Sequence, residues 1–190
     1  MLKEILINPI DNFINEKVDK KYIIICDTLR NDFEKYFLSL SKKEYAPAYV
    51  IRKDGTIHKF YDELCYSNYT NFEKINKTSI FIALENAGKL TNKDNEFINW
   101  CEEKIDVKNV KELINNKEFS HYEKYTKTQV ESLGHLVIYL GNKYSLNLKE
   151  INLKNREDNA IIFLSHIDAF SNSPNPTLNC DLLNSIIFQN

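Results

Sequence analysis

Three short apolar runs, rich in isoleucine and free of charge, constrain the fold of this 190-residue chain most strongly. They cover residues 22–26, 79–84 and 160–164. Runs of this length and composition are typical of strands that are covered on both faces. Between them, residues 31–40 and 126–140 place apolar side chains three or four positions apart, which indicates amphipathic helices. Strands that alternate with helices predict an α/β domain.

A hairpin signal indicates that the sheet is mixed. Asp54-Gly55 lies between two short apolar segments, residues 49–51 and 56–60, and an Asp-Gly pair in this setting favours a β-hairpin. Because a hairpin needs antiparallel neighbours, we expect a mixed central β-sheet flanked by helices. Thr126 and Gln129 have the spacing of a capping box, which predicts that the second helix begins there.

The segment 89–125 is polar, with few apolar anchors. Such a composition predicts an irregular excursion over the surface rather than a second domain. We therefore expect one domain over residues 1–190.

Charge and hydropathy argue against two classes of partner. A formal net charge of -2 offers no basic field for nucleic acid or anionic lipid. No run reaches the roughly 18 apolar residues of a membrane span, and the first residues lack the pattern of a leader peptide. We expect a cytoplasmic protein with no nucleic-acid or membrane partner. Its four cysteines are scattered without C-x-x-C spacing, which favours reduced thiols.

Five segments carry a resemblance to a known family. The segments are Ile23-Ile-Ile-Cys-Asp-Thr28, Ala48-Tyr-Val-Ile-Arg-Lys-Asp-Gly-Thr-Ile57, Ser79-Ile-Phe-Ile-Ala-Leu-Glu-Asn86, Tyr125-Thr-Lys-Thr-Gln129, and Ser165-His-Ile-Asp168 followed by Asn175-Pro-Thr177. In their order and spacing they resemble the N-acetylmuramoyl-L-alanine amidases, a family that includes type 2 amidases and peptidoglycan recognition proteins. The resemblance spans about residues 20–180 and implies the family's mixed sheet with flanking helices.

The resemblance implies a zinc site, but most of its ligand positions are altered. The three positions fall on Cys26, His166 and Asn175, and a neutral amide is a poor zinc ligand. Cys26 and His166, with Asp27 or Asp168 as a third group, form a conceivable altered site. The alternative, which we favour, is that Cys26 is a small buried hydrophobe. We expect no cofactor, with zinc bound only if the altered site is real.

The positions that the family uses for acid–base chemistry are also altered. The catalytic glutamate position falls on Ala83, and the position of a cation near the last ligand falls on Ser173. Glu85 would share the strand face of Ala83 if the register continues. The resemblance therefore implies no catalytic residue in this chain.

Three tyrosines follow the hairpin, in the stretch where the family lines its substrate groove: Tyr61, Tyr66 and Tyr69. If exposed, they would suit contact with sugar or peptide, together with Asn175, and core packing is the alternative. We expect a partner to engage this face through Tyr66 and the loop 171–177. On that interpretation, Tyr66→Ala weakens binding and leaves thermal stability nearly unchanged.

Three functions are considered, and the sequence favours the first of them. The first is a catalytically degenerate amidase-like domain, a pseudoenzyme that binds a partner or serves as a structural part of an assembly of phage or secretion-system origin. The second is an active zinc-dependent amidase with rearranged ligands, and the third is a domain that binds peptidoglycan fragments without cleaving them. The partner is accordingly another protein or a peptidoglycan fragment.

Overall fold

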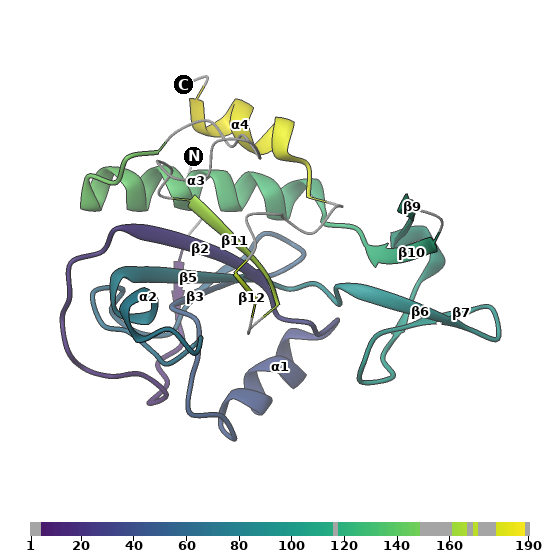
Figure 1. The fold of residues 1–190 in the computed structure, drawn as a ribbon, viewed down its shortest axis with the longest axis horizontal. Coiled ribbons are helices and arrows are strands. Elements are labelled where there is room, and N and C mark those ends of the chain that lie inside the picture. The colour runs from purple at the N-terminus through teal and green to yellow at the C-terminus, as the bar shows by residue number, and fades with distance from the viewer. Residues whose placement is uncertain (1–4, 116–117, 149–160, 167–168, 171–177, 189–190) are drawn as a thin grey trace.

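The computed structural model describes residues 5–115, 118–148, 161–166, 169–170 and 178–188 (Figure 1). Its main sheet has seven strands in the order β1-β4-β3-β5-β2-β11-β12. The strands are β1 Ile5–Ile7, β2 Tyr22–Asp27, β3 Tyr49–Ile51, β4 Ile57–Lys59, β5 Ser79–Leu84, β11 Ile161–His166 and β12 Ala169–Phe170.

The central strands β3, β5, β2 and β11 are parallel to one another, whereas β3–β4 and β11–β12 are antiparallel pairs. The predicted mixed sheet is therefore confirmed. The apolar runs of β2 and β5 lie in the middle of the sheet, where both faces are covered, and Ile23, Ile24, Ile80 and Ile82 are fully buried.

Helices cover both faces of this sheet. On one face lies α3 Lys127–Tyr144, with α4 Cys180–Phe188 stacked on its outer side, and α1 Phe33–Leu40 lies on the other face (Figure 1). The short helix α2 Glu73–Thr78 leads directly into β5. None of the helices in the described ranges is long and apolar enough to cross a membrane.

Contact between α3 and α4 depends on a glycine. A Cβ atom at Gly134 would lie 2.6 Å from the Cγ2 atom of Ile186, which is closer than real Cβ contacts allow. Glycine at this position therefore allows the two helices to pack closely.

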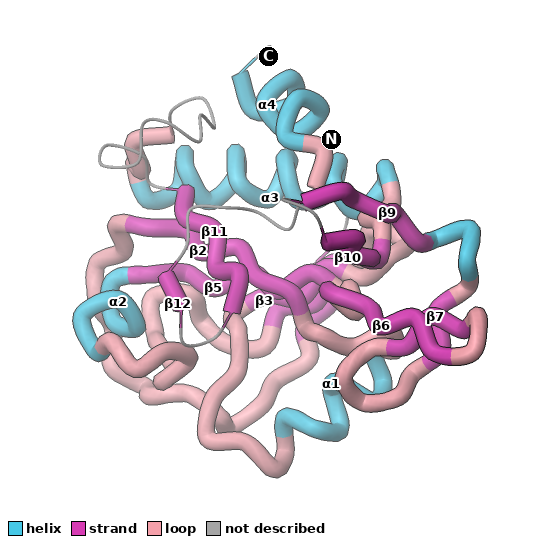
Figure 2. Tube along the Cα trace, turned by 45° about the vertical axis from the view of Figure 1, so that its right-hand side comes forward, coloured by secondary structure: helices cyan, strands magenta, loops and turns pink. Residues whose placement is uncertain are grey.

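The segment 89–125 forms a second, five-stranded sheet with the order β8-β7-β6-β10-β9, which we call the β-arm. Its elements are β6 Lys89–Lys93, β7 Glu96–Ile98, β8 Lys104–Ile105, the 3-10 helix η1 Val107–Asn109, β9 Val110–Asn115 and β10 Glu118–Glu123. Figures 1 and 2 show the β-arm projecting from the side of the main sheet.

The prediction of an irregular excursion was wrong for this segment. The β-arm is ordered by antiparallel pairing, and among its described side chains Leu90 and Ile105 form a small buried cluster with Ala87, against which Phe97 and Val110 pack. In β6, β7 and β8 few of the described side chains are buried, and the apolar alternation that reveals a strand in a sequence is weak there.

Candidate functional site

Cys26 and Ala83 lie side by side. The resemblance places a zinc ligand at the first of these positions and a catalytic glutamate at the second. Both are near the carboxyl ends of parallel strands, and Cys26 of β2 is the register partner of Ala83 of β5. Ala83 is in turn the register partner of Val50 of β3.

Cys26 is surrounded by uncharged groups that pack around its sulfur atom. We call Cys26 together with these groups the Cys26 position. The Cys26 Sγ atom lies 3.5 Å from the hydroxyl oxygen of Tyr69 and 3.6 Å from the carbonyl oxygen of Ile82, both of which can accept the thiol proton. The Tyr69 ring packs against Phe81, with 4.8 Å between ring centroids. Burial raises the pKa of the Cys26 thiol to about 12 and also raises that of the nearby Tyr36 hydroxyl.

Of the three positions that the resemblance assigns to zinc, Cys26 is the one whose side chain lies within the described residues. A cysteine binds metal as a thiolate, and burial raises the pKa of the Cys26 thiol in the metal-free chain. Within the described ranges, no three His, Cys, Asp or Glu side chains gather closely enough to hold a metal ion. The side chain of His166 and the whole of Ser173 and Asn175 lie outside the described residues.

The three predicted binding tyrosines lie in the core. Tyr61, Tyr66 and Tyr69 are only 4–6% exposed. The Tyr61 hydroxyl donates to the carbonyl of Ala46 at 3.0 Å, and the Tyr66 hydroxyl donates to Glu16 at 2.9 Å. Core packing, the alternative given for these residues, therefore describes them better than exposed anchors.

The burial of Tyr66 also corrects the expectation about its truncation. Replacing a buried ring by alanine typically costs about 3 kcal/mol or more, so Tyr66→Ala should destabilise the fold. The rest of the predicted contact face, the loop 171–177, lies outside the described residues.

Glu85 is a structural carboxylate at the strand ends. It accepts hydrogen bonds from the backbone amides of Phe33 and Lys53, each at 3.0 Å, and so ties the start of α1 and the β3–β4 hairpin to the end of β5. Burial raises the pKa of Glu85, and these two amides, with the charges of Lys53 and Arg52, act against that rise. These contacts occupy both carboxylate oxygens.

This network is extended by four residues: Lys53, Glu123, Thr126 and Gln129. Together with Glu85, they form what we call the strand-end junction. Glu123 forms an ion pair with Lys53 and accepts from the amide of Ala87 at 2.6 Å. Thr126 donates its hydroxyl to the carbonyl of Lys53.

The predicted capping box is only half formed. The Thr126 hydroxyl accepts from the backbone amide of Gln129 at 3.1 Å, but the Gln129 side chain forms its hydrogen bonds with other residues. The side-chain amide of Gln129 donates to the carbonyls of Ile51 and Glu85, at 3.0 and 3.1 Å, and thereby links the ends of β3 and β5.

A groove of about 600 Å³ opens beside the junction. Its lining is predominantly polar and comprises Asn31, Asp32, Phe33, Glu34, Lys35, Arg52, Glu85, Cys101, Glu102, Glu103 and Lys104. The sequence interpretation missed this groove because four of its eleven lining residues come from the segment read as an excursion. A signal in that polar segment was Trp100, the chain's only tryptophan, which directly precedes the lining residue Cys101.

Comparisons with known proteins agree with this architecture. The family model of the N-acetylmuramoyl-L-alanine amidases matches residues 16–176. No curated protein matches the chain. Among solved structures, the hydrolase AmiA of Staphylococcus aureus, in complex with its ligand, is 11% identical with a TM-score of 0.57, and the match covers 98% of this chain and 84% of AmiA.

Two further solved structures are similar. AmpD is 12% identical with a TM-score of 0.52, over 98% of this chain and 96% of AmpD. The amidase LysC from Clostridium intestinale URNW is 19% identical with a TM-score of 0.47, over 76% of this chain and 78% of LysC. At these identities the structural likeness to AmiA and AmpD bears on the fold alone.

Proposed function

We propose that this chain, which belongs to the N-acetylmuramoyl-L-alanine amidase family, binds peptidoglycan fragments without cleaving them. One observation carries the proposal. Where the resemblance places a metal ligand and a catalytic glutamate, Cys26 is a buried thiol in contact with the Tyr69 hydroxyl, and Ala83 offers no polar side-chain atom.

Amide hydrolysis by a zinc enzyme requires a metal-activated water and a group that moves its proton. Cys26 holds its proton at neutral pH, and Tyr69, the polar side chain within reach of its sulfur, is itself a neutral hydroxyl with a raised pKa. Removal of a single stabilising group typically lowers the rate on the order of a hundredfold or more. Loss of the metal together with the glutamate should therefore abolish measurable turnover.

The binding part of the proposal rests on family membership and on a rigid scaffold. The ends of β3 and β5 and the starts of α1 and α3 are linked by Glu85 and Gln129, so the surface at this edge of the sheet is held in one geometry. A pre-organised surface loses little entropy when a ligand binds. A peptidoglycan fragment is the ligand class that the family implies.

The first test concerns cleavage and metal. We expect protein from zinc-replete cells to carry well below one zinc per chain, and we expect no release of stem peptide from muropeptides above a matched His166→Ala control. One tightly held zinc per chain that disappears in Cys26→Ala or His166→Ala would overturn the degenerate site and favour the active amidase with rearranged ligands.

The second test concerns binding. Calorimetric titration with a muropeptide that keeps both the sugar and the stem peptide should give a saturable heat signal. Absence of binding at millimolar ligand would overturn the peptidoglycan proposal and leave a protein partner, in a structural role, as the function to pursue.

A further inference from the structure

We infer that Trp100 and the polar groove beside it form a carbohydrate site that takes a neutral sugar ring of a glycan. The inference deepens the proposed function, because it names the glycan as the bound part of the ligand. It depends on the β-arm and the start of α1, and not on the Cys26 position.

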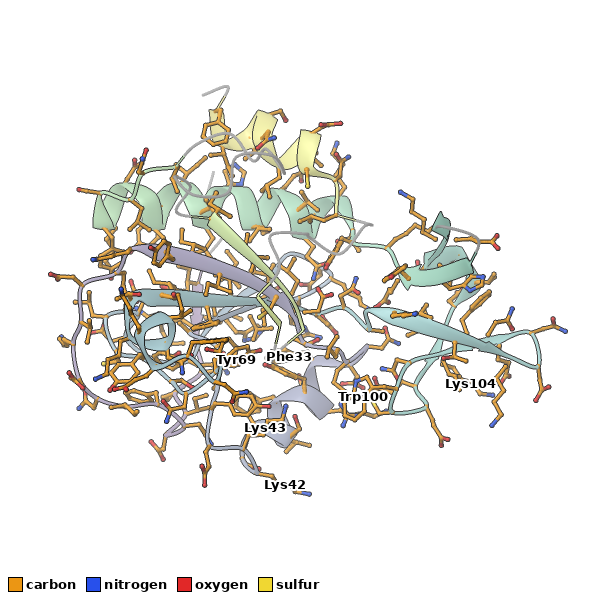
Figure 3. All side chains as sticks on the ribbon, in the orientation of Figure 1. Phe33, Lys42, Lys43, Tyr69, Trp100 and Lys104 are labelled. Atoms are coloured by element: carbon orange, nitrogen blue, oxygen red, sulfur yellow. The ribbon has the colours of Figure 1, made fainter. Side chains whose placement is uncertain are left out.

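Trp100 is presented to solvent in a fixed orientation. The residue is 68% exposed, yet its indole nitrogen donates to the carbonyl of Leu29 at 2.8 Å. The guanidinium of Arg30 lies 5.2 Å from the centre of the indole ring. Figure 3 shows the side chain beside α1, near Phe33. An exposed tryptophan fixed at its polar edge offers a flat apolar surface without a large loss of side-chain entropy.

The loop that carries Trp100 is built around Asn99. The Asn99 side chain accepts from the amides of Cys101 and Glu103, at 3.1 and 2.9 Å, and donates to the Glu103 carboxylate at 2.7 Å. Glu103 also accepts from the amide of Asn31 at 2.9 Å, which fixes the loop to the segment before α1. The indole and the groove are therefore held in one position relative to each other.

Backbone strain supports this reading. Leu29, whose carbonyl holds the indole, has a φ of 57°, and Glu102, next to the groove, has a φ of 61°. Non-glycine residues in this left-handed region cost on the order of 1 kcal/mol each and tend to cluster at binding sites.

The groove has the size and polarity of a site for a neutral polar ligand. Its volume of about 600 Å³ lies within the range of small-molecule sites. Its lining holds five carboxylates and three cations, and the ion pairs of Glu103 with Arg30 and of Glu85 with Arg52 offset part of this acidic excess. Donors and acceptors without a strong net field suit hydroxyl and acetamido groups, while the C–H face of a sugar ring packs on an indole.

A protein partner is less well matched to this surface. Residues that anchor protein interfaces are usually surrounded by contacts that exclude water. Charged side chains border Trp100 here: Arg30 lies against its ring, and Glu102 and Glu103 follow it in the loop.

The test uses the fact that Trp100 is the chain's only tryptophan. Titration with N-acetylglucosamine tetramer should change the intrinsic fluorescence of the full chain, and calorimetry should give the same dissociation constant. By calorimetry, Trp100→Ala should weaken tetramer binding at least tenfold, whereas Trp100→Phe should retain part of it. Phe72→Ala, which removes a half-exposed aromatic elsewhere, is the matched control and should bind normally.

The outcomes separate this inference from the proposed function. If an intact muropeptide binds the native chain and Trp100→Ala equally well, the carbohydrate site is wrong and the proposed function stands. If the tetramer binds through Trp100 and the muropeptide does not bind, the site stands and the proposed function fails. If neither ligand binds, both the site and the proposed function fail, and retained tetramer binding in Trp100→Ala overturns the site.

Discussion

The strand-end junction and the Cys26 position lie at the same edge of the main sheet, yet one is charged and the other is neutral. In the junction, Glu85 and Glu123 are buried carboxylates whose oxygens are bound by backbone amides and Lys53. At the Cys26 position, a buried thiol and an alanine occupy the positions onto which the resemblance places a metal ligand and a catalytic glutamate.

This difference separates two reasons for a residue to match a family pattern. Thr126 and Gln129 match it, and their hydrogen bonds join the hairpin and the strand ends to α3. Cys26 and Ala83 do not match it, and both positions would serve chemistry in an active enzyme. Under the proposed function, this chain keeps the contacts on which its geometry depends and lacks the polar groups that the chemistry needs.

The largest expected effect is in the junction. Glu123→Ala should lower the free energy of unfolding by about 4 kcal/mol, because it leaves the partly buried Lys53 ammonium and the Ala87 amide without their carboxylate. Glu123 is only 1% exposed, so water cannot replace it without rearrangement. Urea unfolding measures this change.

Glu96→Ala is the matched control for that variant. Glu96 pairs with Lys104 at 2.7 Å on the surface, where removal of an ion pair typically costs about 0.5 kcal/mol or less. Similar losses in both variants would show that the junction is no more important than a surface pair.

The next effect concerns the side chain that fills the Cys26 position. Tyr69→Ala should cost about 3 kcal/mol, because it removes a buried ring that packs against Phe81 and Tyr45. Tyr69→Phe keeps the ring and should cost about 1 kcal/mol. Thermal unfolding of the pair distinguishes packing from hydrogen bonding. If Tyr69→Ala leaves the stability unchanged, the Cys26 position is an open site.

A buried ionic cluster at the opposite edge of the sheet tests whether the junction is special. Glu63 pairs with Lys59 and Lys143. Burial alone would raise the pKa of Glu63, but the two ammonium groups outweigh burial and lower it to about 2. The carboxyl pKa of an unfolded chain is about 4.3, so the stabilisation is complete above that pH and disappears as the pH falls towards 2.

Glu63→Gln should therefore remove on the order of 2–3 kcal/mol at neutral pH, and its stability should change less than that of the native chain between about pH 4.5 and 2. Urea unfolding at several pH values measures both effects. An unchanged acid profile in Glu63→Gln would show that other carboxyl groups determine acid unfolding.

Local sequence patterns predicted those elements whose structure depends on residues close together in the chain. The isoleucine run of β2, the Asp54-Gly55 hairpin and the apolar stripe of α3 were identifiable because periodicity and turn chemistry act over a few residues. The burial of Tyr66 was not, because its partner Glu16 lies fifty residues earlier in the chain. The β-arm was missed for a related reason, since its strands pair with one another and few of the side chains described in β6, β7 and β8 are buried.

The smallest expected effect is at Cys26 itself, and it tests the comparison most directly. Cys26→Ala should cost about 1 kcal/mol, because it removes one sulfur atom and weak contacts with Tyr69 and the Ile82 carbonyl. Thermal unfolding with and without a zinc chelator measures this cost. The chelator should not change the unfolding temperature of either protein, since a ligand that binds only the folded state would raise it. If the chelator lowers the unfolding temperature of the native chain but not that of Cys26→Ala, Cys26 is a metal ligand. The contrast between a neutral Cys26 position and a charged junction would then be wrong.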